Sequence, residues 1–153
     1  MQTPEAALAS LGHTLPAPPK PVAAYIPFRR SGNLLFISGQ IALRDGALIA
    51  SGPVPSQVSL ETARACAVQC CLNGLAVIKS AIGDLAKVRQ IIRLGVFVCS
   101  DLAFTDQPKV ANAASELLVQ IFGDAGRHAR AAVGSIALPL GTPVEIEFTV
   151  EVE

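Results

Sequence analysis

Arg130 and Glu145 are the two residues of this sequence whose types and positions best suit them for chemistry. Arg130 opens a stretch in which Ser135 is the only polar side chain before Pro139. A guanidinium held at a strand end by apolar surroundings can bind a small carboxylate through two parallel hydrogen bonds. Glu145 follows 15 residues later, and a carboxylate near such a site can hold or deprotonate a water molecule.

Two predicted strands carry this pair, one over residues 131–138 and one over 144–152. The second alternates without a break, so that one set of side chains faces one way and the other set faces the opposite way: Val144, Ile146, Phe148, Val150 and Val152 against Glu145, Glu147, Thr149 and Glu151. We expect the two strands to pair as a β-hairpin, with Arg130 and Glu145 on neighbouring strands. Taken alone, this pattern equally fits a surface arginine and a solvated glutamate face.

The remaining pattern predicts the elements that would position the pair. Thr3, Pro4 and Glu5 are typical of a helix start, and "LPAPPKP" at 15–21 predicts an extended connector. Further predictions are strands at 22–28, 34–43, 47–50 and 88–99, with helices at 59–82 and from about 108 to 123. This order predicts an α+β fold with one mixed sheet and helices on one face. We expect a single domain over 1–153, in which 1–21 form an N-terminal arm and connector.

Other residue types that often carry chemistry give weaker signals. Three of the four cysteines (Cys66, Cys70 and Cys71) lie on the apolar arc of the long helix, as small core residues do. No CxxC pair or phosphate-binding glycine loop is present, so we expect no metal. Arg127 and His128 are interpreted as surface or rim residues.

Composition narrows the possible partners. Hydrophobic residues make up 51% of the chain and charged residues only 16%, below the ~25% usual in globular domains. Some apolar surface is therefore expected to be buried between subunits. Basic and acidic residues balance at 12 each and Trp is absent, which argues against nucleic acid as a partner. Without a long uninterrupted apolar run or a hydrophobic leader, we expect no membrane and a cytoplasmic location.

Several segments together resemble one known family. "SGQI" at 38–41, "VFV" at 96–98 and "HARAAVGSIALPLGTPVEIE" at 128–147, in this order of elements, are similar to the YjgF/RidA family of imine and enamine deaminases. The resemblance covers residues 20–153. It implies a chorismate-mutase-like α+β fold with two main helices, assembled as a homotrimer with its sites between subunits.

The resemblance also implies a role for individual residues. Arg130 would bind the substrate carboxylate and Glu145 would handle the attacking water. The pocket would be completed by residues that match the family at four further positions: Tyr25, Ser38, Gly39 and Asn112. Two departures stand out, because Ala132 replaces a Cys, Thr or Ser of the active deaminases and "AAY" replaces "GPY" before the tyrosine.

The resulting hypothesis is hydrolysis of small 2-imino or 2-enamino acids to 2-keto acids and ammonia. Neither a metal nor an organic cofactor is expected, since an imine carbon is already electrophilic. A non-catalytic protein that binds a keto acid or another small carboxylate metabolite is the alternative, which Ala132 keeps open. A chorismate mutase would need a second cationic contact beside Arg130, and the sequence offers no obvious one.

Overall fold

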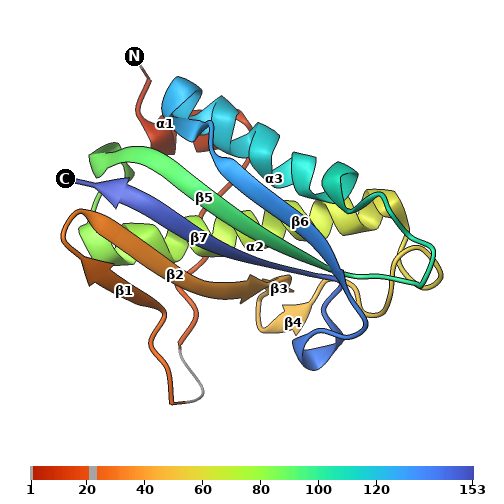
Figure 1. The fold of residues 1–153 in the computed structure, drawn as a ribbon. Coiled ribbons are helices and arrows are strands. Elements are labelled where there is room, and N and C mark those ends of the chain that lie inside the picture. The colour runs from red at the N-terminus through yellow and green to blue at the C-terminus, as the bar shows by residue number, and fades with distance from the viewer. Residues whose placement is uncertain (1, 21–23) are drawn as a thin grey trace.

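In the computed structural model, which describes residues 2–20 and 24–153, five strands form one mixed sheet (Figure 1). Their order is β1-β2-β7-β5-β6, and their bounds are β1 Phe28–Ser31, β2 Leu34–Ile41, β5 Val88–Cys99, β6 Ala129–Ser135 and β7 Val144–Val152. β5 and β6 run parallel, while the other neighbours are antiparallel. The predicted α+β class with one mixed sheet is confirmed.

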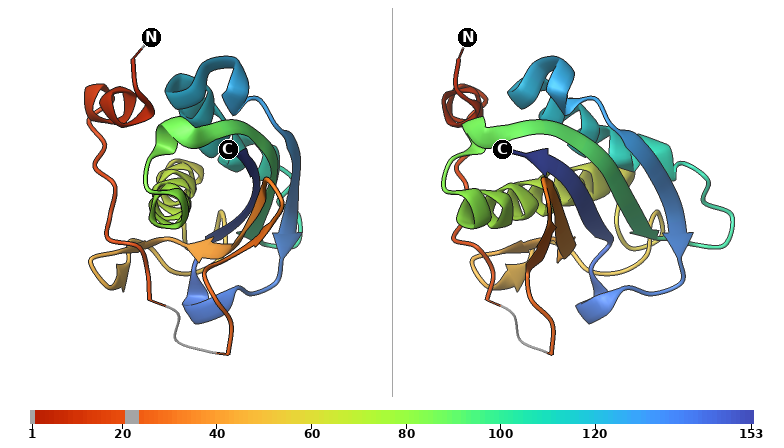
Figure 2. Two further views of the ribbon diagram at one scale, coloured as in Figure 1. Left: turned by 90° about the vertical axis from the view of Figure 1, so that its left-hand side faces the viewer. Right: turned by 60° about the vertical axis from the view of Figure 1, so that its left-hand side comes forward.

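Two helices, α2 (Leu60–Ile82) and α3 (Gln107–Phe122), lie on one face of this sheet (Figure 2). Ser59 caps α2 by accepting a hydrogen bond from the Thr62 amide at 3.1 Å, as its position in the sequence predicts. The core fills the space between helices and sheet, where Leu75, Leu118 and Ile146 are fully buried. The four cysteines are buried free thiols, and the interpretation of Cys66, Cys70 and Cys71 as core residues is confirmed.

By length and mean hydropathy (1.5), α2 alone among the described helices could cross a membrane. However, 72% of its apolar window is buried within the protein. Its burial against the sheet and α3 is typical of a core helix.

The expected hairpin between the last two strands is wrong. β6 forms the edge of the sheet, and β5 lies between it and β7. The reason is the connection from β5 through α3 to β6, which is a parallel crossover, so that β6 pairs with the strand before the helix. The turn at Pro139 (η3, Pro139–Gly141) therefore carries the chain across β5 instead of joining neighbours.

The first strand is shifted from its predicted position. The predicted turn at 29–33 largely belongs to β1, which ends at Ser31 and turns through Gly32 in a left-handed conformation (φ 57°). The predicted strand at 22–28 and connector at 15–21 partly concern residues 21–23, which lie outside the described residues. After β2, a small hairpin pairs β3 (Leu43–Arg44) with β4 (Ala47–Leu48).

The N-terminal arm packs onto the domain. Helix α1 (Pro4–Ser10) buries Ala7 and Leu8, and Leu8 belongs to the main hydrophobic core. The Glu5 carboxylate accepts a hydrogen bond from the Leu85 amide at 3.1 Å and pairs with Lys79 at 3.4 Å. Leu85 begins the short η1 turn (Leu85–Lys87) that leads into β5. The arm is thus fixed to the body by both apolar and charged contacts.

Candidate functional site

Arg130 lies on the edge strand β6 and points toward α3. Its Nη1 donates hydrogen bonds to Asn112 Oδ1 at 2.9 Å and to Ser115 Oγ at 3.1 Å. Both acceptors lie on the same side of α3, because residues three apart in a helix are neighbours. The structure therefore brings together Arg130 and Asn112, two of the residues singled out from the sequence.

The rest of the Arg130 guanidinium is available to a ligand. Among the described residues, Nη1 alone forms hydrogen bonds, and the side chain is neither fully buried nor fully exposed. A guanidinium carries five N–H donors in a planar fork. Arg130 is consequently fixed on one nitrogen while Nε and Nη2 retain the geometry that binds a carboxylate through two hydrogen bonds.

Glu145 belongs to a second group, around a bulge in β2. Register between β2 and β7 shifts between Ile37 and Gln40, so Ser38 and Gly39 form the bulge. The Glu145 side chain lies directly against Gly39, where a Cβ would stand only 2.9 Å from the carboxylate carbon. Only glycine leaves room for the carboxylate at this position.

Burial raises the pKa of the Glu145 carboxyl, and the neighbouring Glu147 raises it further. Glu147 lies next to Glu145 on the same face of β7, two residues along the strand. A carboxylate with a raised pKa accepts a proton more readily than an ordinary glutamate does. The surroundings of Glu145 therefore suit a group that takes a proton from water.

Ser38 supports the segment that carries Tyr25. Its hydroxyl donates a hydrogen bond to the Ile26 carbonyl at 2.7 Å, and its amide donates to the Pro27 carbonyl at 3.0 Å. Both groups are therefore engaged, and Ser38 fixes the backbone beside Tyr25. Tyr25 itself is 52% exposed, so its ring is accessible to a ligand or to another chain.

A cavity of about 480 Å³ adjoins this second group. Tyr25 and Gly39 contribute to its wall, together with apolar residues of the N-terminal connector, among them Pro16, Ala17 and Pro19. Asn73 of α2 also lines it, and donates hydrogen bonds to the Ile41 and Leu43 carbonyls at 3.0 Å each. This mainly apolar cavity therefore meets the glutamate group at Gly39, whose other neighbour is the Glu145 side chain.

Arg130 and Glu145 lie on opposite faces of the sheet. Arg130 pairs in register with Leu94, which pairs with Phe148, and these two apolar side chains are buried beneath the helices. Glu145 is three residues from Phe148 along β7 and therefore faces the other way. Strand geometry separates the pair by about 10 Å along the strands and about 10 Å across them. Within one copy of the chain, a small substrate cannot contact both.

The described residues thus hold two half-sites. The arginine half-site comprises Arg130, Asn112 and Ser115, and the glutamate half-site comprises Tyr25, Ser38, Gly39 and Glu145. Ala132, two residues after Arg130, lies on the helix side of β6 and packs against the core. Its side chain is a methyl group, so it adds no polar group to the arginine half-site.

Sequence reasoning missed two residues next to Arg130. Ser115 Oγ lies 2.9 Å from His128 Nε2, and His128 Nδ1 lies 2.7 Å from the Gly126 carbonyl oxygen. The interpretation of His128 as a surface or rim residue did not include these contacts, and its half-buried ring lies against α3. Two signals were present in the sequence: His128 precedes Arg130 by two, the spacing of one strand face, and Ser115 follows Asn112 by three, the spacing of one helix face.

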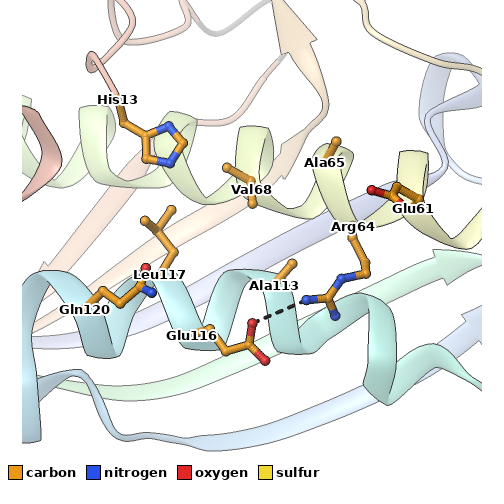
Figure 3. A pocket seen from close by; sticks show the side chains of 9 residues that line it. All are labelled: His13, Glu61, Arg64, Ala65, Val68, Ala113, Glu116, Leu117 and Gln120. Carbon is orange, nitrogen blue, oxygen red and sulfur yellow. Dashed lines mark hydrogen bonds and ion pairs between the residues drawn. The ribbon is translucent and has the colours of Figure 1, made fainter. Parts of the chain in front are cut away.

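The cysteines and a second hollow are weaker candidates for a functional site. Burial raises the pKa of Cys66 to about 11 and that of Cys71 to about 12, so neither thiol is a nucleophile at neutral pH. A separate hollow of about 340 Å³ lies between α2 and α3 beneath His13 (Figure 3). Its Arg64 already pairs with Glu116 at 3.3 Å (Figure 3), so this hollow presents mainly paired charges.

Comparison with known proteins identifies the family to which this chain and its fold belong. The model of a family described as "YjgF/chorismate mutase-like, putative endoribonuclease" matches residues 5–151. The chain belongs to this YjgF/RidA family, and the fold and resemblance inferred from the sequence are confirmed.

Three relatives are similar over nearly the whole chain. Protein TCP17 of Trypanosoma cruzi is 39% identical over 145 residues, which cover 94% of this chain and 91% of that protein. The crystal structure of Atu1372 from Agrobacterium tumefaciens is 43% identical with a TM-score of 0.93, covering 98% of this chain and 92% of the other. A Shewanella oneidensis structure that carries the same endoribonuclease description is 30% identical with a TM-score of 0.95, covering 99% of this chain and 100% of the other.

Proposed function

We propose that this protein is a hydrolytic deaminase of small 2-imino or 2-enamino acids, with a site completed between subunits. The observation that carries the proposal is the pair of half-sites on opposite faces of the sheet. One holds a guanidinium with free nitrogens, and the other holds a carboxylate with a raised pKa packed against Gly39. A second copy that brings its arginine half-site to the glutamate half-site would place both groups around one substrate.

The open face of the sheet supports this assembly. Phe36 is 44% exposed and Val133 46% exposed, although both are large apolar side chains on strands. Glu145 lies on the same face, because Phe97 pairs in register with both Val133 and Glu145. Covering this face with another subunit would bury the apolar side chains and close the site at once. We propose a homotrimer, in accordance with the family resemblance.

The reaction follows from the two groups. Arg130 of one subunit binds the substrate carboxylate and places the imine carbon near Glu145 of the neighbour. Glu145 accepts a proton from water as the water oxygen bonds to that carbon, giving a tetrahedral carbinolamine. The imine enters protonated, so the carbinolamine nitrogen is a neutral amine, and Glu145 passes the proton from water to it. The carbon–nitrogen bond then breaks, the hydroxyl proton moves to the departing ammonia, and ammonium and the 2-keto acid are released. Glu145 ends the cycle in its starting state.

The test is release of ammonia from imino acids that an amino-acid oxidase generates in the assay. Arg130→Ala removes a charge-assisted hydrogen-bonding partner, a loss of about 1.5–3 kcal/mol, which corresponds to a fall in kcat/KM of about 10- to 150-fold. Arg127→Ala is the matched control, since Arg127 pairs with the exposed Asp124 at 3.3 Å and contacts neither half-site. Unchanged imine hydrolysis in Arg130→Ala would contradict the assignment.

Binding without turnover is the alternative, and Ala132 is the observation that favours it. Calorimetry with small 2-keto acids, run beside the ammonia assay, separates the two functions. Binding that depends on Arg130 without faster ammonia release would identify a metabolite-binding protein. The nuclease description of the family is tested with the same preparation, and the balanced charge of the chain predicts no retention on RNA at physiological salt.

A further inference from the structure

The hydrogen bonds around Arg130 form a chain with only one possible direction. A carbonyl oxygen can only accept, so His128 Nδ1 must donate its proton to the Gly126 carbonyl. In the neutral ring, Nε2 is then an acceptor, and the Ser115 hydroxyl donates to it across 2.9 Å. Ser115 Oγ in turn accepts from Arg130 Nη1. Each group thus fixes the orientation of the next.

A second proton on His128 would break this chain. Nε2–H would then become a donor pointing at Ser115 Oγ, which already accepts from Arg130. A serine hydroxyl has only one proton, and here it would lose its acceptor. Its oxygen would also lie between two cations. The arrangement therefore favours a neutral His128.

The surroundings favour that neutral ring. Burial lowers the pKa of the His128 imidazole, while the hydrogen bond to Gly126 acts in the opposite direction and the Arg130 charge lowers it again. Arg130 is the charged group that acts on the ring, and several charged groups on the neighbouring elements have partners or directions of their own. On the η2 turn (Gly123–Gly126) Asp124 pairs with Arg127, on α3 Glu116 pairs with Arg64, and on β5 Arg93 faces away from the helices.

We infer that Ser115 and His128 are positioning residues that hold the Arg130 guanidinium in its carboxylate-binding orientation, and that they release it when the ring is protonated. As far as turnover is concerned, this inference rests on the proposed deaminase function. Asn112 fixes the same Nη1 but does not titrate, so it provides no pH response. Carboxylate binding by Arg130 is therefore expected to weaken as the pH falls through the pKa of His128.

The hydrogen-bond chain can be measured without any substrate. The sequence contains only His13 and His128, so ¹⁵N correlation spectra of the imidazoles resolve both, with His13→Gln to assign them. We expect the Nδ1–H tautomer at His128, held by the Gly126 carbonyl, a shifted Nε2 resonance in Ser115→Ala, which removes the donor to Nε2, and a raised pKa of His128 in Arg130→Ala. A His128 ring in the Nε2–H tautomer, or one that is indifferent to Ser115→Ala, would overturn the inference whatever the activity of the protein.

Kinetics then test the positioning role. Ser115→Ala is expected to raise KM for the imino acid about tenfold, or about 1.4 kcal/mol, with a smaller change in kcat. Ser115→Thr keeps a hydroxyl and is expected to restore most of the loss. Ser80→Ala is the matched control, since Ser80 Oγ donates only within its own helix, to the Val77 carbonyl at 2.7 Å. A loss that Thr does not rescue, or that Ser80→Ala shares, would contradict the inference.

The pH response separates positioning from packing. His128→Gln cannot titrate, so the rise in KM toward acidic pH should disappear, whatever KM this variant has at neutral pH. An acid limb that survives in His128→Gln would overturn the role of the ring. The two proposals can fail independently. If the imidazole spectra are as expected but no imine is hydrolysed, the deaminase proposal is wrong. If hydrolysis depends on Arg130 but the His128 spectra do not respond to Ser115→Ala, the inference about the hydrogen-bond chain is wrong.

Discussion

The carboxylate of Glu145 lies so close to the backbone of Gly39 that a Cβ atom on residue 39 would overlap with it. Gly39→Ala is therefore expected to displace Glu145, which is the flexible partner, with little effect on the thermal midpoint. Turnover should fall about 10-fold or more, as when a catalytic group is moved by about 1 Å.

Gly95→Ala provides a matched control for that prediction. A Cβ at Gly95 would stand 2.6 Å from Glu147 Oε1, the same kind of contact on the neighbouring strand. It displaces Glu147, which adds to the raised pKa of Glu145 but is not proposed to contact the substrate, so its effect on turnover should be much smaller. Equal losses in the two variants would show that the position of Glu145 is not what matters.

Glu145 should also make stability depend on pH. Its pKa is raised in the folded protein, so the folded state binds protons more tightly than the unfolded state, and the contribution of this group to stability is lost as pH rises through the folded pKa. Glu145→Gln is consequently expected to unfold at higher denaturant than wild type at pH 7. This advantage should shrink below pH ~4, where the wild-type carboxyl is protonated.

Chemical denaturation at the two pH values measures this difference. Glu151→Gln, a substitution on the same face of β7, is the matched control. If Glu145→Gln gains the same stability at acidic and neutral pH, then ionising Glu145 does not lower the free energy of unfolding, and the prediction is wrong.

A site shared between subunits predicts recovery of activity from two inactive variants. In mixed oligomers of Arg130→Ala and Glu145→Gln, assembled at equal amounts by co-expression, random mixing gives about one quarter of the sites both native groups. Imine hydrolysis should then return to about a quarter of wild type. Each variant assembled alone is the control. No recovery in oligomers shown to be mixed would place both residues in the site of one chain.

Gly74 of α2 packs so closely against β7 that adding one methyl group at this position should destabilise the fold. A Cβ at Gly74 would stand 2.7 Å from Cζ of the Phe148 ring, which is buried in the core. Gly74→Ala is expected to lower the free energy of unfolding by about 1–3 kcal/mol through overpacking, despite the better helix propensity of alanine. Urea denaturation measures it, with Ser80→Ala on the same helix as control. A stabilised variant would mean that the ring can move aside.

The sequence predicted most elements because their signals are local. Ser59 marked the start of α2 and the alternation from Val144 to Val152 marked β7, and neither signal depends on distant residues. The pairing of strands is not local. A short turn at Pro139 suggested a hairpin, whereas the sheet places β5 between the two strands because α3 makes β5 and β6 parallel.

The candidate site was predictable to the same extent. The positions of Arg130 and Asn112 were identified through the resemblance, but their contact with Ser115 and His128 depends on how α3 packs over β6. The sequence periodicity of α3 or of β6 does not indicate how the two elements pack against each other. The opposite-face placement of Glu145 likewise depends on the strand order, which sequence spacing misjudged.

β7 follows every other described strand along the chain, yet it lies in the middle of the sheet, between β2 and β5. During synthesis, β2 and β5 therefore leave the ribosome with an unfilled gap between them, and their facing edges stay open until Val152 has emerged. Long-range pairing of this kind is slow and leaves strand edges exposed to other nascent chains. Co-translational folding of this protein should accordingly be all-or-none, with the glutamate half-site formed only when the final strand inserts.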